Sequence, residues 1–148
     1  MSDFLKGIAA GCVATIILSG LILLKNAVGL GSQPDLTSLL GIDRTSAWIL
    51  HMLLGSLVYG AAFAWLEPNL TADNFTRKGI LFGLIAWLIA MIALMPLAGG
   101  GLFGLKLSLV TPILTLIAHV VYGAMLGWVY GLLLPIRLPL LTHKPRTT

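Results

Sequence analysis

Charged residues divide the chain into four long apolar runs. The charge-free stretches are Gly7–Leu24, Thr45–Leu66, Gly79–Leu105 and Leu107–Ile136. Each is close to or above the ~20 residues that a helix needs to cross a bilayer. Proline and glycine clusters mark the ends, so we expect spanning helices over about 7–24, 46–66, 77–97 and 112–134. The pattern predicts an all-α membrane protein, a four-transmembrane-helix bundle that forms one domain over residues 1–148.

The composition agrees with this pattern. Of the 148 residues, 58% are hydrophobic and 9% are charged, whereas soluble proteins carry roughly 25% charged residues. The longest connection, about 25–44, has too few apolar residues to bury a core of its own. The stretch 99–105 is rich in glycine and also apolar, and the sequence leaves open whether it re-enters the membrane.

The distribution of basic residues predicts the orientation in the membrane. Six lysines and arginines lie in the N-terminus, the middle connection and the tail, and three lie in the other two connections. Because cytoplasmic segments carry an excess of basic residues, we expect both termini in the cytoplasm. Residues 137–148 form a short basic tail that we expect to lie against anionic lipid head groups.

Two pairs of matching segments indicate an internal repeat. Lys6–Gly11 and Lys78–Gly83 both read K-G-I-x-x-G, at an offset of 72 residues. His51-x-x-x-Gly55 and His119-x-x-x-Gly123 match at an offset of 68 residues. They predict two two-helix repeats, about 1–70 and 74–136. Each repeat crosses twice, so the repeats are parallel and related by a pseudo-twofold axis along the membrane normal.

His51 and His119 are the candidate site residues, because ionisable side chains inside spans are rare and mark functional sites. The alignment at offset 68 places them at equivalent positions and similar depth. Two facing imidazoles are suitable axial ligands for a b-type haem. Gly55, Gly123 and Gly127 would let the porphyrin approach the backbone. No metal site other than this haem iron is expected.

Two other interpretations of the histidines remain open. The pair could bind a quinone or another small molecule, or relay protons. Alternatively, each imidazole forms a structural hydrogen bond inside the bundle, for which the sequence offers Ser56, Thr115, Tyr59 or Tyr122.

Glycines also recur every four residues along three of the predicted spans. Such small-residue faces let membrane helices approach closely. They serve contacts within the bundle, a homo-oligomer, or contacts with other membrane subunits. The positions are Gly7 and Gly11, Gly79 and Gly83, and Gly123, Gly127 and Gly131.

The chain has no recognisable catalytic set. It lacks a Ser-His-Asp set, a phosphate-binding loop and a zinc pattern, and no acidic residue lies within a span. Enzymes acting alone, ion-coupled pumps and nucleic-acid binding are therefore disfavoured. We expect a non-catalytic accessory or assembly subunit of a larger membrane complex, for example a respiratory one. The alternatives are the haem-binding electron carrier and the quinone-binding protein described above.

Four segments carry a resemblance to a known family. They are Lys6–Gly11, Phe63–Pro68, Met95–Gly99 and Gly101–Gly104. On these segments the chain resembles a family of small uncharacterised bacterial inner-membrane proteins, a domain of unknown function. The resemblance implies a multi-pass protein of the bacterial cytoplasmic (inner) membrane. It implies no activity and no site residues.

Overall fold

The computed structural model describes residues 2–28, 37 and 40–134, and in this part of the chain it contains helices and turns but no strand. Within it, four helical segments are long and apolar enough to cross a membrane: Asp3–Leu24, Arg44–Asn69, Phe75–Leu97 and Thr111–Leu133. The predicted all-α membrane fold is confirmed. The basic tail 137–148 and most of the first connection lie outside the described residues.

The first hairpin joins one continuous helix to one composite helix. Helix α1 (Asp3–Ala27) starts at Ser2, whose hydroxyl caps it. The second span consists of α3 (Arg44–Leu53), the π-helix η1 (Leu54–Tyr59), α4 (Gly60–Leu66) and the 3₁₀ turn η2 (Glu67–Asn69). Pro68 lies in η2, where a missing N–H ends the α-helical pattern.

The second hairpin has the same plan. Its first span is α5 (Phe75–Ile89), the π-helix η3 (Ala90–Leu94) and α6 (Met95–Leu97). A connection with the 3₁₀ turn η4 (Leu102–Gly104) leads to α7 (Thr111–Leu133), which has Pro112 in its first turn. Proline is tolerated there because that N–H has no partner within the helix.

The glycine-rich connection of the second hairpin folds back on the ends of its helices. Gly99, Gly101 and Gly104 have positive φ angles, which glycine adopts without strain. The N–H of Lys106 donates to the carbonyl of Gly100 at 3.1 Å, closing a tight turn. Gly104 is buried against Thr111.

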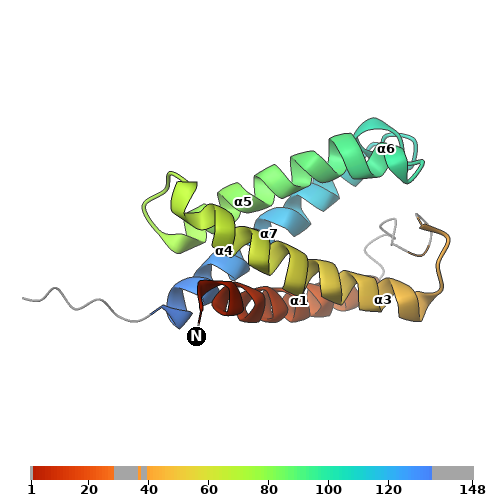
Figure 1. The fold of residues 1–148 in the computed structure, drawn as a ribbon. Helices are drawn as coiled ribbons and strands as arrows, with labels where there is room; N and C mark the ends of the chain where they lie inside the picture. Colours follow the sequence, from red (N-terminus) through yellow and green to blue (C-terminus); the bar gives the residue numbers. More distant parts are fainter. Residues whose placement is uncertain (1, 29–36, 38–39, 135–148) are drawn as a thin grey trace, which may run out of the picture.

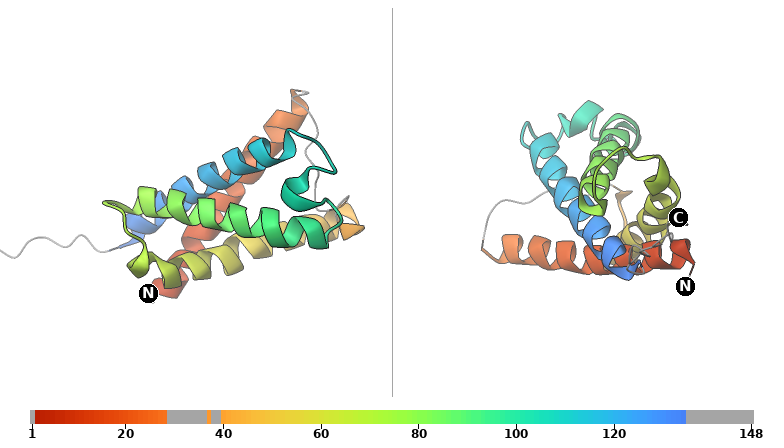
Figure 2. Two further views of the ribbon diagram at one scale, coloured as in Figure 1. Left: turned by 90° about the horizontal axis from the view of Figure 1, so that it is seen from above. Right: turned by 90° about the vertical axis from the view of Figure 1, so that its left-hand side faces the viewer.

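The two hairpins lie closer together at one end of the molecule than at the other (Figure 1). They converge at the end that holds the N-terminus, here called the terminal end, and spread apart toward α3 and α6 at the far end. Helix α1 contacts both α4 of its own hairpin and α7 of the other. In the views of Figure 2, α1 crosses α7 at a wide angle.

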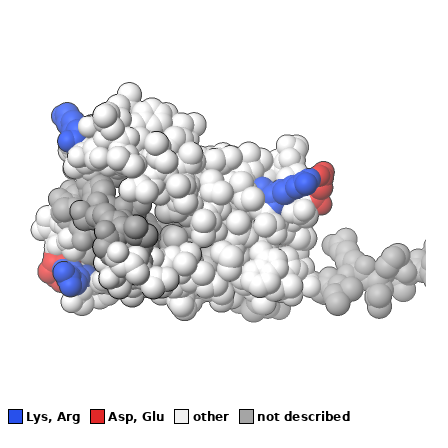
Figure 3. Space-filling view, turned by 180° about the vertical axis from the view of Figure 1, so that it is seen from behind, with Lys and Arg blue, Asp and Glu red and all other residues white. Residues whose placement is uncertain are grey.

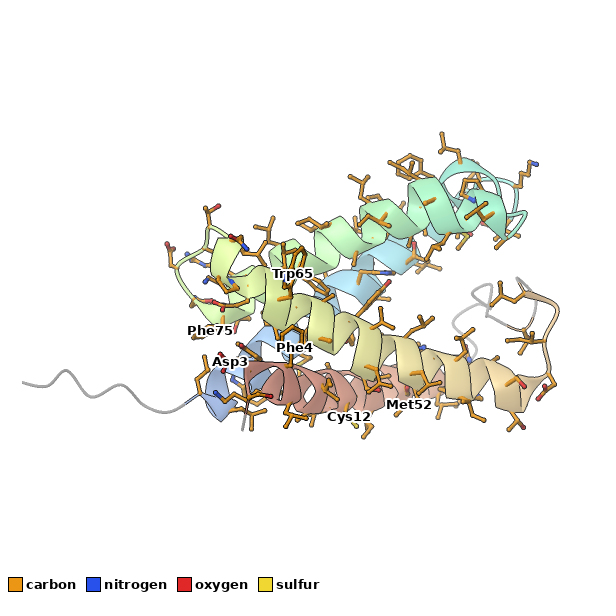
Figure 4. All side chains as sticks on the ribbon, viewed as in Figure 1. Asp3, Phe4, Cys12, Met52, Trp65 and Phe75 are labelled. Carbon is orange, nitrogen blue, oxygen red and sulfur yellow. The ribbon has the colours of Figure 1, made fainter. Side chains whose placement is uncertain are left out.

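The surface fits a protein that spans a bilayer. In Figure 3 the charged side chains of one face gather at the two ends, and the band between them is uncharged. Figure 4 shows Trp65 and Phe75 toward the terminal end and Met52 nearer the far end. Trp65 is 69% exposed, as expected for a tryptophan at a membrane interface. Many large apolar side chains are exposed along the spans, and only a small part of each span is buried inside the protein.

One ion pair fastens the connection between the hairpins at the terminal end. Lys78 Nζ lies 2.5 Å from Glu67 Oε1 and 3.1 Å from the carbonyl oxygen of Glu67. The side chains of both residues are largely buried, at 18% and 14% exposure. The lysine also lies 5.7 Å from the centre of the Phe75 ring. The pair therefore ties the start of α5 to the end of α4.

Candidate functional site

The glycine faces pack against each other within each hairpin. A Cβ added to Gly7 would overlap the carbonyl oxygen of Gly60, and it would lie 2.7 Å from Cβ of Ala64. A Cβ added to Gly79 would overlap the carbonyl oxygen of Gly123. Each hairpin is thus closed by backbone-to-backbone contact that only glycine permits. A partner protein would have to use another surface.

These contacts define how the two hairpins correspond. Gly7 and Gly79, which are 72 residues apart as the K-G-I-x-x-G match predicts, occupy the same position in their hairpins. Their partners Gly60 and Gly123 are 63 residues apart, not 68. At this offset the second helices share the pattern V-Y-G-A-x-x-x-W, over 58–65 and 121–128. This longer match was available in the sequence and was missed in favour of the histidine match.

At the offset of 63 residues, the two histidines do not occupy corresponding positions. A Cβ added to Gly83 would meet the carbonyl of His119, and one added to Gly11 would meet the carbonyls of Gly55 and Ser56, at 2.8 and 2.9 Å. His119 therefore corresponds to Ser56. His51 lies five residues closer to the far end, about 7 Å along the helix. The predicted equivalence of His51 and His119 does not agree with the packing.

His51 lies within the first hairpin and faces α1. Its Nε2 is 3.1 Å from Oγ of Ser19, and its ring meets the edge of Trp48 with centroids 5.6 Å apart. The Ser19 hydroxyl donates its only proton to the carbonyl of Thr15 at 2.7 Å. Ser19 must therefore accept a hydrogen bond from the Nε2–H of His51. Ser19 was not among the partners predicted from the sequence.

His119 lies on α7 and faces the line where the hairpins meet. Its Nδ1 is 2.8 Å from the carbonyl oxygen of Thr115, one turn earlier. A carbonyl only accepts, so Nδ1 carries the proton and Nε2 presents a lone pair. The His119 ring lies beside that of Tyr59, with centroids 6.4 Å apart. Thr115 and Tyr59 were both among the predicted neighbours of the histidines.

Tyr59 and Tyr122 form a central pair across the two hairpins. They correspond at the offset of 63 residues, and their ring centroids are 5.8 Å apart. The Tyr122 hydroxyl donates to the carbonyl oxygen of Gly55 at 2.5 Å. Gly55 lies in the π-helix η1, where the backbone departs from the α pattern, whereas Ala118, its counterpart, lies in the regular helix α7.

The polar groups beside Tyr122 and those beside Tyr59 therefore differ in their hydrogen bonding. On one side, Tyr122 is bonded to Gly55, and the Ser56 hydroxyl donates to the carbonyl of Met52. On the other side, neither the Tyr59 hydroxyl nor Nε2 of His119 makes a hydrogen bond to any residue that the structure describes. Both side chains are partly buried.

The predicted haem site does not fit this arrangement. The backbone at Gly55 is covered by Thr15, that at Gly123 by Gly79, and that at Gly127 by Phe75, so a porphyrin has no place beside these glycines. The two histidines lie at different levels and face different residues. Among the described residues, no three side chains of the types His, Cys, Asp or Glu form a metal-binding group.

Comparison with known proteins identifies a family but no activity. A family model described as "Family of unknown function (DUF6789)" matches residues 1–139. No curated protein and no solved structure matches the chain. The match confirms the resemblance to an uncharacterised family that the sequence segments carried.

Proposed function

The chain belongs to the DUF6789 family, and we propose that it is a non-catalytic accessory or assembly subunit of a larger membrane complex. A single glycine carries the proposal. Nine of the ten glycines in the four spans have another part of the chain within 4 Å of an added Cβ, and Gly20 has no atom of the described residues there.

A glycine facing only lipid is unfavourable in a helix. Glycine costs about 1 kcal/mol relative to alanine in a helix interior, because of its conformational freedom. In membrane helices this cost is offset where a second helix approaches closely. The other span glycines of this chain follow that rule. Gly20 follows it as well if a helix of another protein covers its face.

The surroundings of Gly20 support the same proposal. No side chain described in α1 beyond Thr15 is buried. The right-hand view of Figure 2 shows this far half of α1 reaching away from the other helices. Ser19 and His51 form its polar contact to α3. A partner helix beside Gly20 would cover an apolar surface that the described residues of this chain leave open.

Purification from native membranes in a mild detergent tests the proposal. We expect the protein to co-purify with at least one other membrane protein, and Gly20→Leu to abolish the association. Ala93→Leu enlarges an exposed small residue of the other hairpin and should leave the association intact. A solitary chain, a complex of this chain alone, or a partner retained by Gly20→Leu would each refute the proposal.

We also propose that the membrane is the bacterial cytoplasmic membrane and that both termini are cytoplasmic. The excess of basic residues in the termini and the middle connection supports this orientation. Green fluorescent protein fused to the C-terminus should fluoresce, because it folds in the cytoplasm. A dark fusion that is present in the membrane at normal level would contradict the orientation.

A further inference from the structure

We propose that Tyr59 and His119 bind the head group of a lipid-soluble molecule whose hydroxyl or carboxyl group both accepts and donates a hydrogen bond. The site lies beside Tyr59, between α7 and the composite second span. It is separate from the Gly20 face on which the accessory role rests. It also requires no contribution from His51.

The chemistry follows from the two unpartnered atoms. The Tyr59 hydroxyl is a donor, and Nε2 of His119 is an acceptor because Nδ1–H is bonded to Thr115. Neither atom has a hydrogen-bond partner within the described part of the chain. Polar groups left unpaired in hydrocarbon are costly. A ligand that satisfies both must accept a hydrogen bond from Tyr59 and donate one to His119.

The position selects for a lipid-soluble ligand. His119 is eight residues from the start of α7, about 12 Å along the helix. Tyr59 is ten residues before the end of its span, about 15 Å. Both lie near the middle of the ~30 Å hydrocarbon layer. Molecules reach this depth most readily from the bilayer, with an apolar tail that remains among the lipids.

The neighbouring residues explain why the site lies on one side only. Tyr122, the counterpart of Tyr59, is closed off by its hydrogen bond to Gly55 in the π-helix. Ser56, the counterpart of His119, donates to its own helix. At corresponding positions of the two hairpins, Tyr122 and Ser56 are thus hydrogen-bonded, whereas Tyr59 keeps a free donor and His119 a free acceptor within the described residues.

Two head groups share the required chemistry. A carboxylic acid accepts at its carbonyl oxygen and donates from its hydroxyl, and the ring hydroxyl of a quinol both accepts and donates. The full-length protein in detergent would be titrated separately with dodecanoic acid and with a decyl-substituted benzoquinol, by isothermal calorimetry. One-to-one binding of either probe supports the proposal and identifies the source.

Variants locate the binding. Tyr59→Phe and His119→Leu should each weaken binding about tenfold, as expected for the loss of one buried hydrogen bond. His51→Leu and Tyr122→Phe remove the matched groups outside the site and should bind as the parent does. Unfolding midpoints within the parental range would show that Tyr59→Phe and His119→Leu remain folded.

Three results would overturn the proposal. Binding of neither probe would mean that water alone satisfies the two polar atoms. Parental affinity in Tyr59→Phe or His119→Leu would remove one of the two contacts. An equal loss in His51→Leu would place the ligand elsewhere. None of these results bears on co-purification through Gly20.

Discussion

Adding one methyl group should stabilise the protein at Gly20 but not at Gly79. At Gly79 an added Cβ would overlap the carbonyl oxygen of Gly123 and lie 2.8 Å from the backbone nitrogen of Gly127. Both obstacles are backbone atoms, which move only if α5 and α7 separate. At Gly20 the same atom meets nothing within 4 Å.

The size of the difference follows from the two contributions. Both Gly79→Ala and Gly20→Ala gain about 1 kcal/mol of helix propensity, so this gain cancels in the comparison. What remains is the cost of forcing an extra carbon between packed helices, about 1–3 kcal/mol. Gly20→Ala should therefore be more stable than the parent. Gly79→Ala should be less stable than Gly20→Ala by about 1–3 kcal/mol.

The assay is reversible unfolding in mixed micelles, with sodium dodecyl sulfate as denaturant and far-ultraviolet circular dichroism as the signal. Equal helix content before denaturant is added shows that both variants start folded. Equal midpoints for the two variants would refute the close backbone contact between α5 and α7.

Three further predictions concern single contacts. Tyr122→Phe removes the hydrogen bond to Gly55 and should cost about 1 kcal/mol in the same unfolding assay, with no change in helix content; an unchanged midpoint would contradict this. Glu67→Gln leaves Lys78 partly buried without its charge partner and should cost about 1–3 kcal/mol, an effect that a Lys78→Met background should remove. Asp43 caps α3, and hydrogen bonds from Ser46 hold the pKa of its carboxyl below the usual value. Protection of the first turn of α3 from amide exchange should therefore persist above pH ~4 and be lost as pH falls through that lowered pKa, whereas Asp43→Ala should show no such pH step.

The fold was predictable from the sequence because lipid imposes a simple constraint. A chain in hydrocarbon must bond its own backbone groups, so an uncharged run of about 20 residues becomes a helix. The four spans followed directly from the positions of the charges. The two π-helices did not, because they extend a helix by one residue without altering its hydrophobicity.

The candidate site was only partly predictable. His119, Tyr59 and Thr115 were named from the sequence, and the structure brings them together. The pairing of His119 with His51 was wrong because two histidines drew the alignment to an offset of 68 residues. The contacts of Gly60 and Gly123 follow the longer V-Y-G-A-x-x-x-W match instead.

The contact of Ser19 with His51 could not have been found from spacing. It depends on how far α1 lies from α3, which is a property of helix packing. Likewise, Gly20 differs from the other nine glycines of the spans only in the structure, where each of the nine contacts another part of the chain. The sequence shows a glycine, and the structure shows that nothing in the described chain approaches it.

Unequal side chains at corresponding positions account for the uneven packing of the hairpins. At the offset of 72 residues, Ala10 of α1 corresponds to Phe82 of α5. Ala10 is fully buried, and α1 lies directly against α7. Phe82 instead meets the composite second span through its ring, with centroids 6.0 Å from Tyr59 in η1 and 5.5 Å from Phe63 in α4.

The small side chain of Ala10 therefore lets α1 lie directly against α7, whereas the large ring of Phe82 keeps α5 apart from the second span. On the close side, Thr15 of α1 covers Gly55, whose carbonyl accepts the Tyr122 hydroxyl. On the other side, the Phe82 ring lies edge-on to the Tyr59 ring and offers the Tyr59 hydroxyl no hydrogen-bond partner. The difference between Ala10 and Phe82 thus links the packing of the hairpins to the two unpartnered polar atoms of Tyr59 and His119.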